Sequence, residues 1–188
     1  MGGGDKTLLD IGGRPILSHV VERLAQQVSP LALNANGPAS RLAGYGLPML
    51  PDPVPDRPGP LGGILAAMLW AQGLGAREVL TAPADAPFLP RDLAATLRAA
   101  RRGAPGAAIV LARTAQGLHP VVALWPVALA PRLRADLAAG TRKVASWAEA
   151  QGAHTADGSW PEAAFLNVNT PEDLARARAL WEGGEQPA

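Results

Sequence analysis

Short apolar runs alternate along this chain with longer amphipathic stretches, and few folds accommodate that order. Between Pro15 and Gln27 the apolar side chains recur on one stripe behind a proline, as in an amphipathic helix. Glu78–Ala82 is instead a short run with the length of a buried strand. Strands that alternate with helices predict an α/β fold, in which a mainly parallel sheet carries helices on both faces. We expect strands at 30–35, 47–50, 78–82, 107–112, 120–125 and 163–168, and helices at 15–27, 61–73, 90–101, 127–138, 142–150 and 171–181.

Length and composition limit what such a fold can do. Domains average roughly 150 residues, so the 188 residues predict a single domain, 1–181, followed by a flexible tail, 182–188. A net charge of +1 provides no field that would attract nucleic acid or an anionic membrane. The chain has no cysteine, which excludes disulfides, thiolate metal sites and a cysteine nucleophile. We therefore expect a cytoplasmic protein that binds neither nucleic acid nor membrane.

Polar side chains follow four of the expected strands. In α/β sheets of this kind, ligands bind outside the carboxyl ends of the strands, so residues in these positions are candidates for a binding site. Asn167 and Asn169 alternate, which in an extended segment points both side chains the same way. The candidates are Asn34, Asn36, Asp52, Asp85, Asn167 and Asn169.

Each of these residues has a functional and a purely structural interpretation. The Asp85 carboxylate is suited to hold Mg²⁺ together with substrate phosphates, but an aspartate there also suits a turn or a helix cap. Asn34 and Asn36 are suited to contact a base edge or a ribose, or simply to adopt left-handed turn geometry. His119 precedes Pro120 at a strand start, where a structural polar contact and catalysis both stay open.

A glycine run, Gly2-Gly3-Gly4, stands two residues before a lysine, Lys6. Glycines let backbone N–H groups close around phosphate oxygens, and an ammonium group adds a point charge. A frayed terminus or a vector remnant is the plainer interpretation. Of the 17 basic residues only Lys6 and Lys143 are lysine, which favours a site that requires a compact ammonium rather than a planar guanidinium at Lys6.

In their order along the chain these motifs resemble the molybdenum cofactor guanylyltransferases, the MobA-type nucleotidyltransferases. The Gly-Pro-Leu-Gly-Gly motif together with Asn-Val-Asn-Thr-Pro-Glu is the most specific part of the resemblance. The matching stretches are residues 1–9, 33–36, Asp52, 58–63, 83–87, 119–120 and 167–174.

The resemblance implies a Rossmann-like nucleotidyltransferase fold that transfers GMP from GTP to the terminal phosphate of molybdopterin and releases pyrophosphate. The substrate's own phosphate attacks, so positioning and charge neutralisation by Mg²⁺ and a lysine suffice. Implied partners are GTP, molybdopterin and other proteins of cofactor biosynthesis or recipient molybdoenzymes.

The family pattern also assigns roles to individual residues. Lys6, with Gly2 and Gly3, would contact the GTP phosphates, and Asp85 would hold Mg²⁺. The nucleoside would lie at Asn34, Asn36 and Asp52. Asn167 and Asn169 would face the pterin or the reacting centre.

This chain departs from the family pattern at its N-terminus, where the pattern contains more residues. The pattern begins with a strand and a Leu-Ala-Gly-Gly loop, ahead of the Met-Gly that here is Met1-Gly2. We therefore expect the natural start to lie upstream, and the absent strand, roughly five or six residues long, to belong in the middle of the sheet. A chain that starts at Met1 is expected to bind GTP weakly and to transfer little.

Two alternatives remain open at this point. One is a molybdopterin cytidylyltransferase of the same fold, because asparagines alone do not reveal the base. The other is a truncated, non-catalytic homologue that binds the nucleotide or the cofactor.

Overall fold

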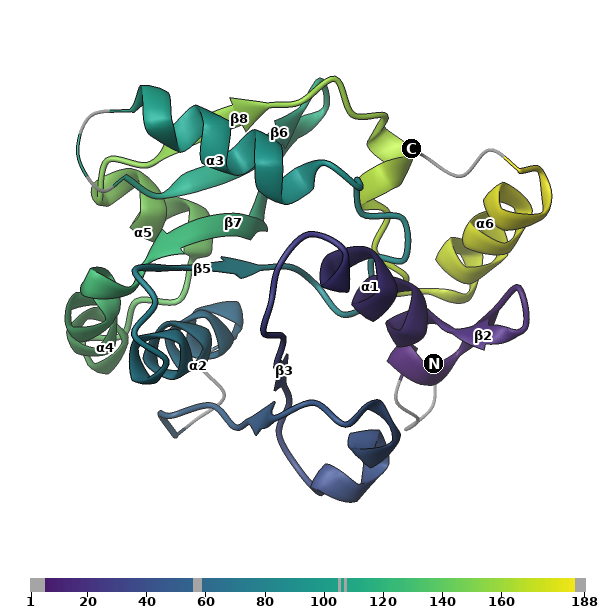
Figure 1. Ribbon diagram of the computed structural model, residues 1–188, viewed down its shortest axis with the longest axis horizontal. Coiled ribbons are helices and arrows are strands. Elements are labelled where there is room, and N and C mark those ends of the chain that lie inside the picture. The colour runs from purple at the N-terminus through teal and green to yellow at the C-terminus, as the bar shows by residue number, and fades with distance from the viewer. Residues whose placement is uncertain (1–5, 56–58, 105, 107, 185–188) are drawn as a thin grey trace.

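The computed structural model describes residues 6–55, 59–104, 106 and 108–184. Its main sheet contains four strands in the order β5-β7-β6-β8 (Figure 1). These strands are β5 (Glu78–Thr81), β6 (Val110–Thr114), β7 (Gly117–Pro126) and β8 (His154–Asp157).

The expected α/β class is confirmed, but the main sheet is mixed rather than mainly parallel. β7 runs antiparallel to both β5 and β6, and β6 is parallel to β8. The reason is the connection between β6 and β7, which consists only of Ala115 and Gln116. A connection this short returns the chain antiparallel, because a parallel pair needs a crossover of roughly a dozen residues or more.

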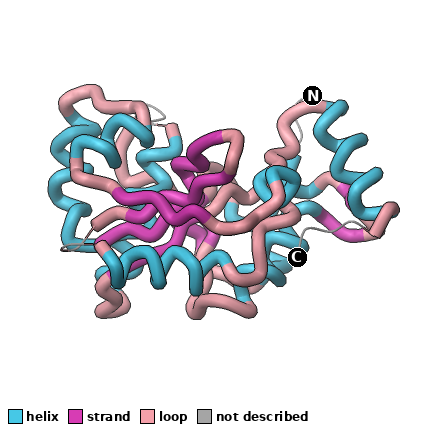
Figure 2. The backbone as a smooth tube through the Cα atoms, turned by 90° about the horizontal axis from the view of Figure 1, so that it is seen from above, coloured by secondary structure: helices cyan, strands magenta, loops and turns pink. Residues whose placement is uncertain are grey.

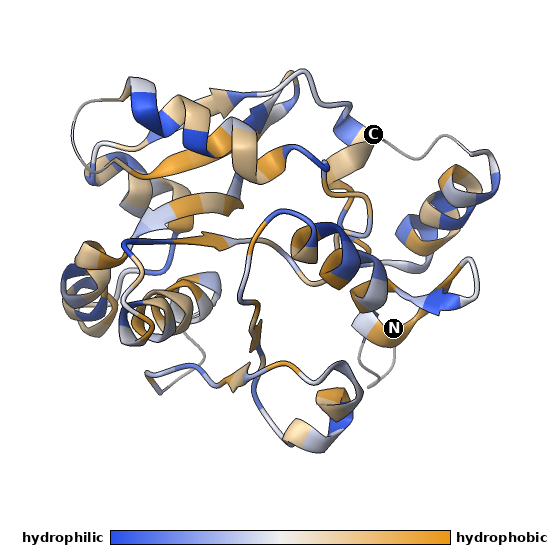
Figure 3. Ribbon diagram, viewed as in Figure 1, coloured by the Kyte–Doolittle hydropathy of each residue, from blue (hydrophilic) through white to orange (hydrophobic). Residues whose placement is uncertain are grey.

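Helices pack on both faces of this sheet, as expected (Figure 2). Side chains alternate along β6, so that Leu111 enters one core while Val110 and Ala112 enter the other. The strands of the main sheet are rich in hydrophobic residues (Figure 3). Over the first core lie α2 (Pro60–Gly73), α4 (Ala130–Ala138, after the short helix η3, Val127–Leu129) and α5 (Val144–Ala150), and over the second lie α3 (Leu93–Gly103), α1 (Ile16–Ala25) and the short helix η4 (Glu162–Phe165).

A smaller N-terminal hairpin packs against the last helix. The hairpin consists of β1 (Asp10–Ile11) and β2 (Arg14–Pro15), and it follows the short helix η1 (Lys6–Leu8). The last helix, α6 (Pro171–Glu182), places Trp181 so close to Gly12 that a Cβ there would lie 2.0 Å from the indole nitrogen. This contact links the two ends of the described chain.

The expected strand at 163–168 is wrong, and β8 takes its place in the sheet. Ala164, Phe165 and Val168 are buried, which explains the apolar run, but Glu162–Phe165 forms η4 and the rest is an extended loop. β8 carries the polar sequence His-Thr-Ala-Asp at the edge of the sheet, where hydropathy gives no strand signal.

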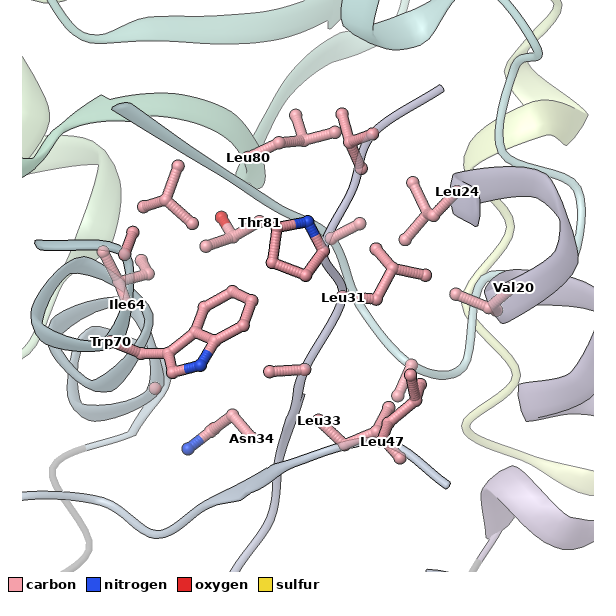
Figure 4. Close-up of a pocket in the computed structure, with 18 of the residues that line it drawn as sticks. Val20, Leu24, Leu31, Leu33, Asn34, Leu47, Ile64, Trp70, Leu80 and Thr81 are labelled. Carbon is pink, nitrogen blue, oxygen red and sulfur yellow. The ribbon is translucent and has the colours of Figure 1, made fainter. Parts of the chain in front are cut away.

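A pair of short parallel strands, β3 (Leu33–Asn34) and β4 (Met49–Leu50), lies apart from the main sheet, with the short helix η2 (Ala39–Tyr45) between them in sequence. Between β3 and β5 lies a cavity of about 390 Å³ (Figure 4). Its lining is mainly apolar and comes from α1, the segment leading into β3, α2 and β5, including Leu24, Leu31, Ile64, Trp70 and Leu80.

No helix in the described parts of the chain is both long and apolar enough to cross a membrane.

Candidate active site

Three residues that are far apart in the sequence meet beyond the end of β5. The Lys6 ammonium group forms an ion pair with Asp85 Oδ2 at 2.5 Å and also donates a hydrogen bond to Asn169 Oδ1. The Asp85 side chain is only 13% exposed, whereas that of Lys6 is 39% exposed. The structure thus combines a shielded carboxylate with a cation that solvent and ligands can reach.

Asp85 and Asn169 are positioned by backbone hydrogen bonds. The Val168 N–H donates to the Asp85 carbonyl oxygen at 2.9 Å, which ties the loop after β5 to the segment before α6. Thr170 caps α6, as its sequence position predicts: its side chain accepts from the Asp173 N–H, and Asp173 accepts from the Thr170 N–H.

The Asp173 carboxylate also fixes the asparagine beside this cap. It accepts a hydrogen bond from the Asn169 N–H at 3.0 Å. The N–H groups of Asn169 and Thr170 lower the pKa of Asp173 below its ordinary value, because they stabilise the charged form. Asp173 is therefore a positioning residue for Asn169.

Replacing Asp173 with asparagine should reduce thermal stability at pH 7. The pKa of Asp173 is lower in the folded state than in the unfolded state. The contribution of the Asp173 charge to folding stability is therefore fully present above the unfolded-state pKa and is lost as pH falls through the folded-state pKa. The difference in unfolding midpoint between wild type and Asp173→Asn should therefore be clear at pH 7 and should shrink near pH 3, measured by circular dichroism. A difference that stays constant with pH would contradict this role for the charge.

Asn34, Asn36 and Asp52 form a second cluster, at the ends of the paired strands β3 and β4. The two Asp52 oxygens accept from Asn34 Nδ2 at 3.0 Å and from Asn36 Nδ2 at 2.8 Å. The Asp52 N–H in turn donates to Asn36 Oδ1 at 3.0 Å. Asn34 Nδ2 also donates to the Leu50 carbonyl oxygen, so both of its hydrogens are used.

Gly63 in the first turn of α2 lies directly against this cluster. A Cβ on Gly63 would lie 2.3 Å from Asn34 Oδ1, so only glycine lets the helix approach this closely. Gly63 was not identified as a site residue from the sequence, although the glycine pair at the start of a helix, where glycine is unfavourable, was a usable signal.

If Asn34 contacts a nucleoside, as the resemblance implies, Gly63→Ala should weaken nucleotide binding severalfold while leaving the fold intact, because the Asn34 amide has to move. Nucleotide affinity can be measured by calorimetry. Gly73→Ala is the matched control, since Gly73 lies in the same helix with nothing within 4 Å of its added Cβ. Equal affinities for the two variants would show that the close approach at Gly63 has no bearing on binding.

Three of the predicted residues remain to be placed. Gly2 and Gly3 lie outside the described residues. Asn167 is exposed and makes no hydrogen bond with the residues that the structure describes, whereas Asn169 accepts from Lys6. Across the described residues there is no group of three or more His, Asp or Glu side chains that could by itself hold a metal ion.

Comparison with known proteins identifies relatives along nearly the whole chain. Residues 1–155 match the model of the MobA-like NTP transferase domain. A molybdenum cofactor guanylyltransferase of Cereibacter sphaeroides is 49% identical over 180 residues, which covers 96% of this chain and 90% of that protein. A molybdenum cofactor guanylyltransferase of Rhodopseudomonas palustris (strain BisB5) is 47% identical over 186 residues, with coverage of 96% and 87%.

Solved structures show the same fold at lower identity. Molybdopterin-guanine dinucleotide biosynthesis protein A from Archaeoglobus fulgidus superposes with a TM-score of 0.73 at 21% identity, over 96% of this chain and 92% of that chain. The 2-C-methyl-D-erythritol 4-phosphate cytidylyltransferase from Thermus thermophilus gives a TM-score of 0.64 at 19% identity, over 96% and 95%. The nucleotidyltransferase fold expected from the sequence is thereby confirmed.

Proposed function

Because this chain belongs to the MobA-like NTP transferase family and matches molybdenum cofactor guanylyltransferases along nearly its whole length, we propose that it transfers GMP from GTP to the terminal phosphate of molybdopterin. An oxygen of that phosphate forms a bond to the α-phosphorus of GTP, the bond from the α-phosphorus to the bridging oxygen breaks, and pyrophosphate leaves. The observation that carries the proposal is the meeting of Lys6, Asp85 and Asn169 beyond the end of β5.

This geometry suits phosphoryl chemistry that needs no protein nucleophile. The Lys6 side chain is exposed enough for its ammonium group to leave Asp85 and pair with incoming phosphate oxygens. Asp85 would hold Mg²⁺, which takes one or two carboxylates and completes its shell with water and substrate phosphates. A single shielded carboxylate fits that requirement. The bound Mg²⁺ would neutralise charge on the phosphates during transfer.

The cluster around Asp52 supports guanine over cytosine. Its amide hydrogens are largely used within the cluster, so it presents mainly acceptors: the carboxylate oxygens of Asp52 and Oδ1 of Asn34. The Watson–Crick edge of guanine carries two adjacent donors, the ring N–H and the amino group, whereas that of cytosine carries one donor and two acceptors. An acceptor-rich cluster therefore complements guanine better.

Asp52→Asn should raise the KM for GTP about tenfold and reduce the preference for GTP over CTP, because it replaces an acceptor oxygen with an N–H₂ donor and removes the charge. Steady-state pyrophosphate release with each nucleotide, Mg²⁺ and molybdopterin measures both effects. Asp136→Asn is the control, since the bonds of Asp136 go to Arg132 and Trp147 and to no residue of this cluster. A wild-type preference for CTP would instead favour a cytidylyltransferase.

The remaining partners follow from the reaction. We infer a cytoplasmic location, because a cysteine-free chain fits a reducing compartment where GTP is available. Other proteins of cofactor biosynthesis, or recipient molybdoenzymes, would take up the product. Nucleotide or pterin affinity without pyrophosphate release would support the non-catalytic alternative.

A further inference from the structure

Three hydrogen-bonded side chains lie near the turn of the β6–β7 hairpin. His119 pairs with Ala112 across the hairpin, and Thr114 stands diagonally beside it on the same face. The Thr114 hydroxyl lies 3.0 Å from His119 Nε2 and donates to Glu162 Oε2 at 2.5 Å. Glu162 is the first residue of η4. This acceptor row, Thr114, His119 and Glu162, therefore joins the sheet to the segment that leads to α6.

These contacts determine which nitrogen of His119 carries the hydrogen. A threonine hydroxyl has one hydrogen. Because Thr114 gives it to Glu162, the hydroxyl must accept from Nε2–H of His119. Burial lowers the pKa of His119, against a smaller opposing effect of Glu162, which favours the neutral ring. His119 Nδ1 is then a hydrogen-bond acceptor.

The ring of His119 is also held in one orientation. Phe165 stacks on it with ring centroids 4.1 Å apart and an interplanar angle of 14°. Phe165 is itself buried and packs against Trp160. The direction of His119 Nδ1 is therefore set by packing as well as by the hydrogen bond to Thr114.

Two acceptors in this row have no protein partner. Neither His119 Nδ1 nor Glu162 Oε1 makes a hydrogen bond with the residues that the structure describes, and neither is sealed from solvent. An ordered pair of acceptors, one neutral and one anionic, suits a ligand that presents N–H donors. The Glu162 carboxylate makes the same place unfavourable for a phosphate.

The row and the Asp52 cluster lie on opposite sides of β5. β3 and β4 lie on one side of β5, and β7 and β6 lie on the other (Figure 1). β7 pairs with β5 from Ala123 to Pro126. The part of β7 before Ala123 extends beyond this pairing: the Thr81 hydroxyl donates to the Val121 carbonyl oxygen, and His119 lies two residues before Val121. The segment from Phe165 reaches Asp85 through Val168. The segment from Phe165 to Val168 therefore connects this row to Asp85.

We propose that Thr114, His119 and Glu162 form the subsite for the acceptor's heterocycle, and that they bind its amino-substituted edge. The inference rests on the proposed function, which makes that acceptor a pterin. A pterin carries a 2-amino group beside a ring N–H, both donors. Glu162 accepts from this edge, His119 accepts from a second donor, and Thr114 acts as a positioning residue for both.

The test compares two probes: pterin, with a 2-amino donor beside its ring N–H, and lumazine, with a carbonyl acceptor in place of the amino group and a hydrogen on the neighbouring N1. Fluorescence titration of the protein should show that pterin binds about tenfold or more tightly than lumazine. Glu162→Gln should remove or reverse this preference, because the glutamine can keep the Thr114 bond while presenting its N–H₂ group to the ligand. Glu149→Gln, at an exposed glutamate on α5, is the control and should keep it.

Kinetics provide a second measurement. His119→Phe preserves an aromatic ring against Phe165 but removes Nδ1, so the KM for molybdopterin should rise about tenfold while the KM for GTP stays unchanged. Normal transfer by the wild type together with equal affinity for pterin and lumazine would overturn this subsite alone. No transfer to molybdopterin, either by this chain or by a version extended ahead of Met1, would overturn the proposed function instead. Thermal midpoints near that of the wild type exclude misfolding as the cause.

Discussion

Asp85→Asn should lower the rate of pyrophosphate release by about a hundredfold or more, in a protein that still folds. The variant keeps the size of the side chain but loses the charge that Lys6 pairs with at 2.5 Å and that would hold Mg²⁺. Removing one preorganised electrostatic group from a polar transition state typically costs about 10²–10³ in kcat. The measurement is steady-state release from GTP, Mg²⁺ and molybdopterin, with each substrate varied in turn.

Lys6→Ala should cause a loss of similar size and should also weaken GTP binding, because it removes the cation that faces the phosphates. Lys143→Ala is its control, since Lys143 is the other lysine of the chain and is exposed. For Asp85→Asn the control is Asp157→Asn, which breaks the surface ion pair with Arg113. If Asp85→Asn or Lys6→Ala releases pyrophosphate at nearly the wild-type rate, the site lies elsewhere.

An extended apolar segment placed in the cavity between β3 and β5 should raise the thermal midpoint by about 4–8 °C. β3 and β5 do not pair with each other across this mainly apolar cavity, so an added strand would bury apolar side chains there. Each apolar side chain that becomes buried contributes about 1.5–3 kcal/mol. In a domain of this size a net gain of about 2 kcal/mol shifts the midpoint by about 4–8 °C.

The position of Lys6 indicates how the strand would connect. A strand parallel to β5 would end near Asp85, with which Lys6 pairs.

The experiment fuses a designed run of five or six valines and isoleucines ahead of Met1 and compares unfolding with and without GTP and Mg²⁺. The control fusion has the same length but carries proline at alternate positions, which removes the ladder donors. The apolar fusion should be the more stable and should show the larger midpoint rise with GTP, as expected of a ligand that binds only the folded state. Equal midpoints for the two fusions would show that the cavity does not accept a strand.

Some features of the candidate site were predictable because their signal is local. Asp85 was identified as a polar residue directly after a buried strand, and the Thr170 cap was identified from a threonine ahead of Pro171 and two acidic residues. The difference between Asn167 and Asn169 was not predictable. Both occupy equivalent alternating positions, and only the hydrogen bonds to Lys6 and Asp173 distinguish Asn169.

The structure also revealed relationships between segments that no local pattern contains. The apolar run at 163–168 resembled a strand because residues buried on a short helix such as η4 are as hydrophobic as residues buried in a sheet. The polar strand β8 was missed because it pairs at an edge, where polar residues are tolerated. Gly63 and the Thr114–His119–Glu162 row depend on contacts between elements distant in sequence.

The sequence by itself determined the α/β class, most helices and the polar residues that follow β3, β4 and β5, because periodicity, caps and turn residues act over a few neighbouring positions. Only the tertiary structure decided the mixed strand order, the meeting of Lys6 with Asp85 and Asn169, and the separate acceptor row at His119. Those features depend on which surfaces pack together once the chain has folded, and the energies of such contacts are set by pairs of residues that lie far apart along it.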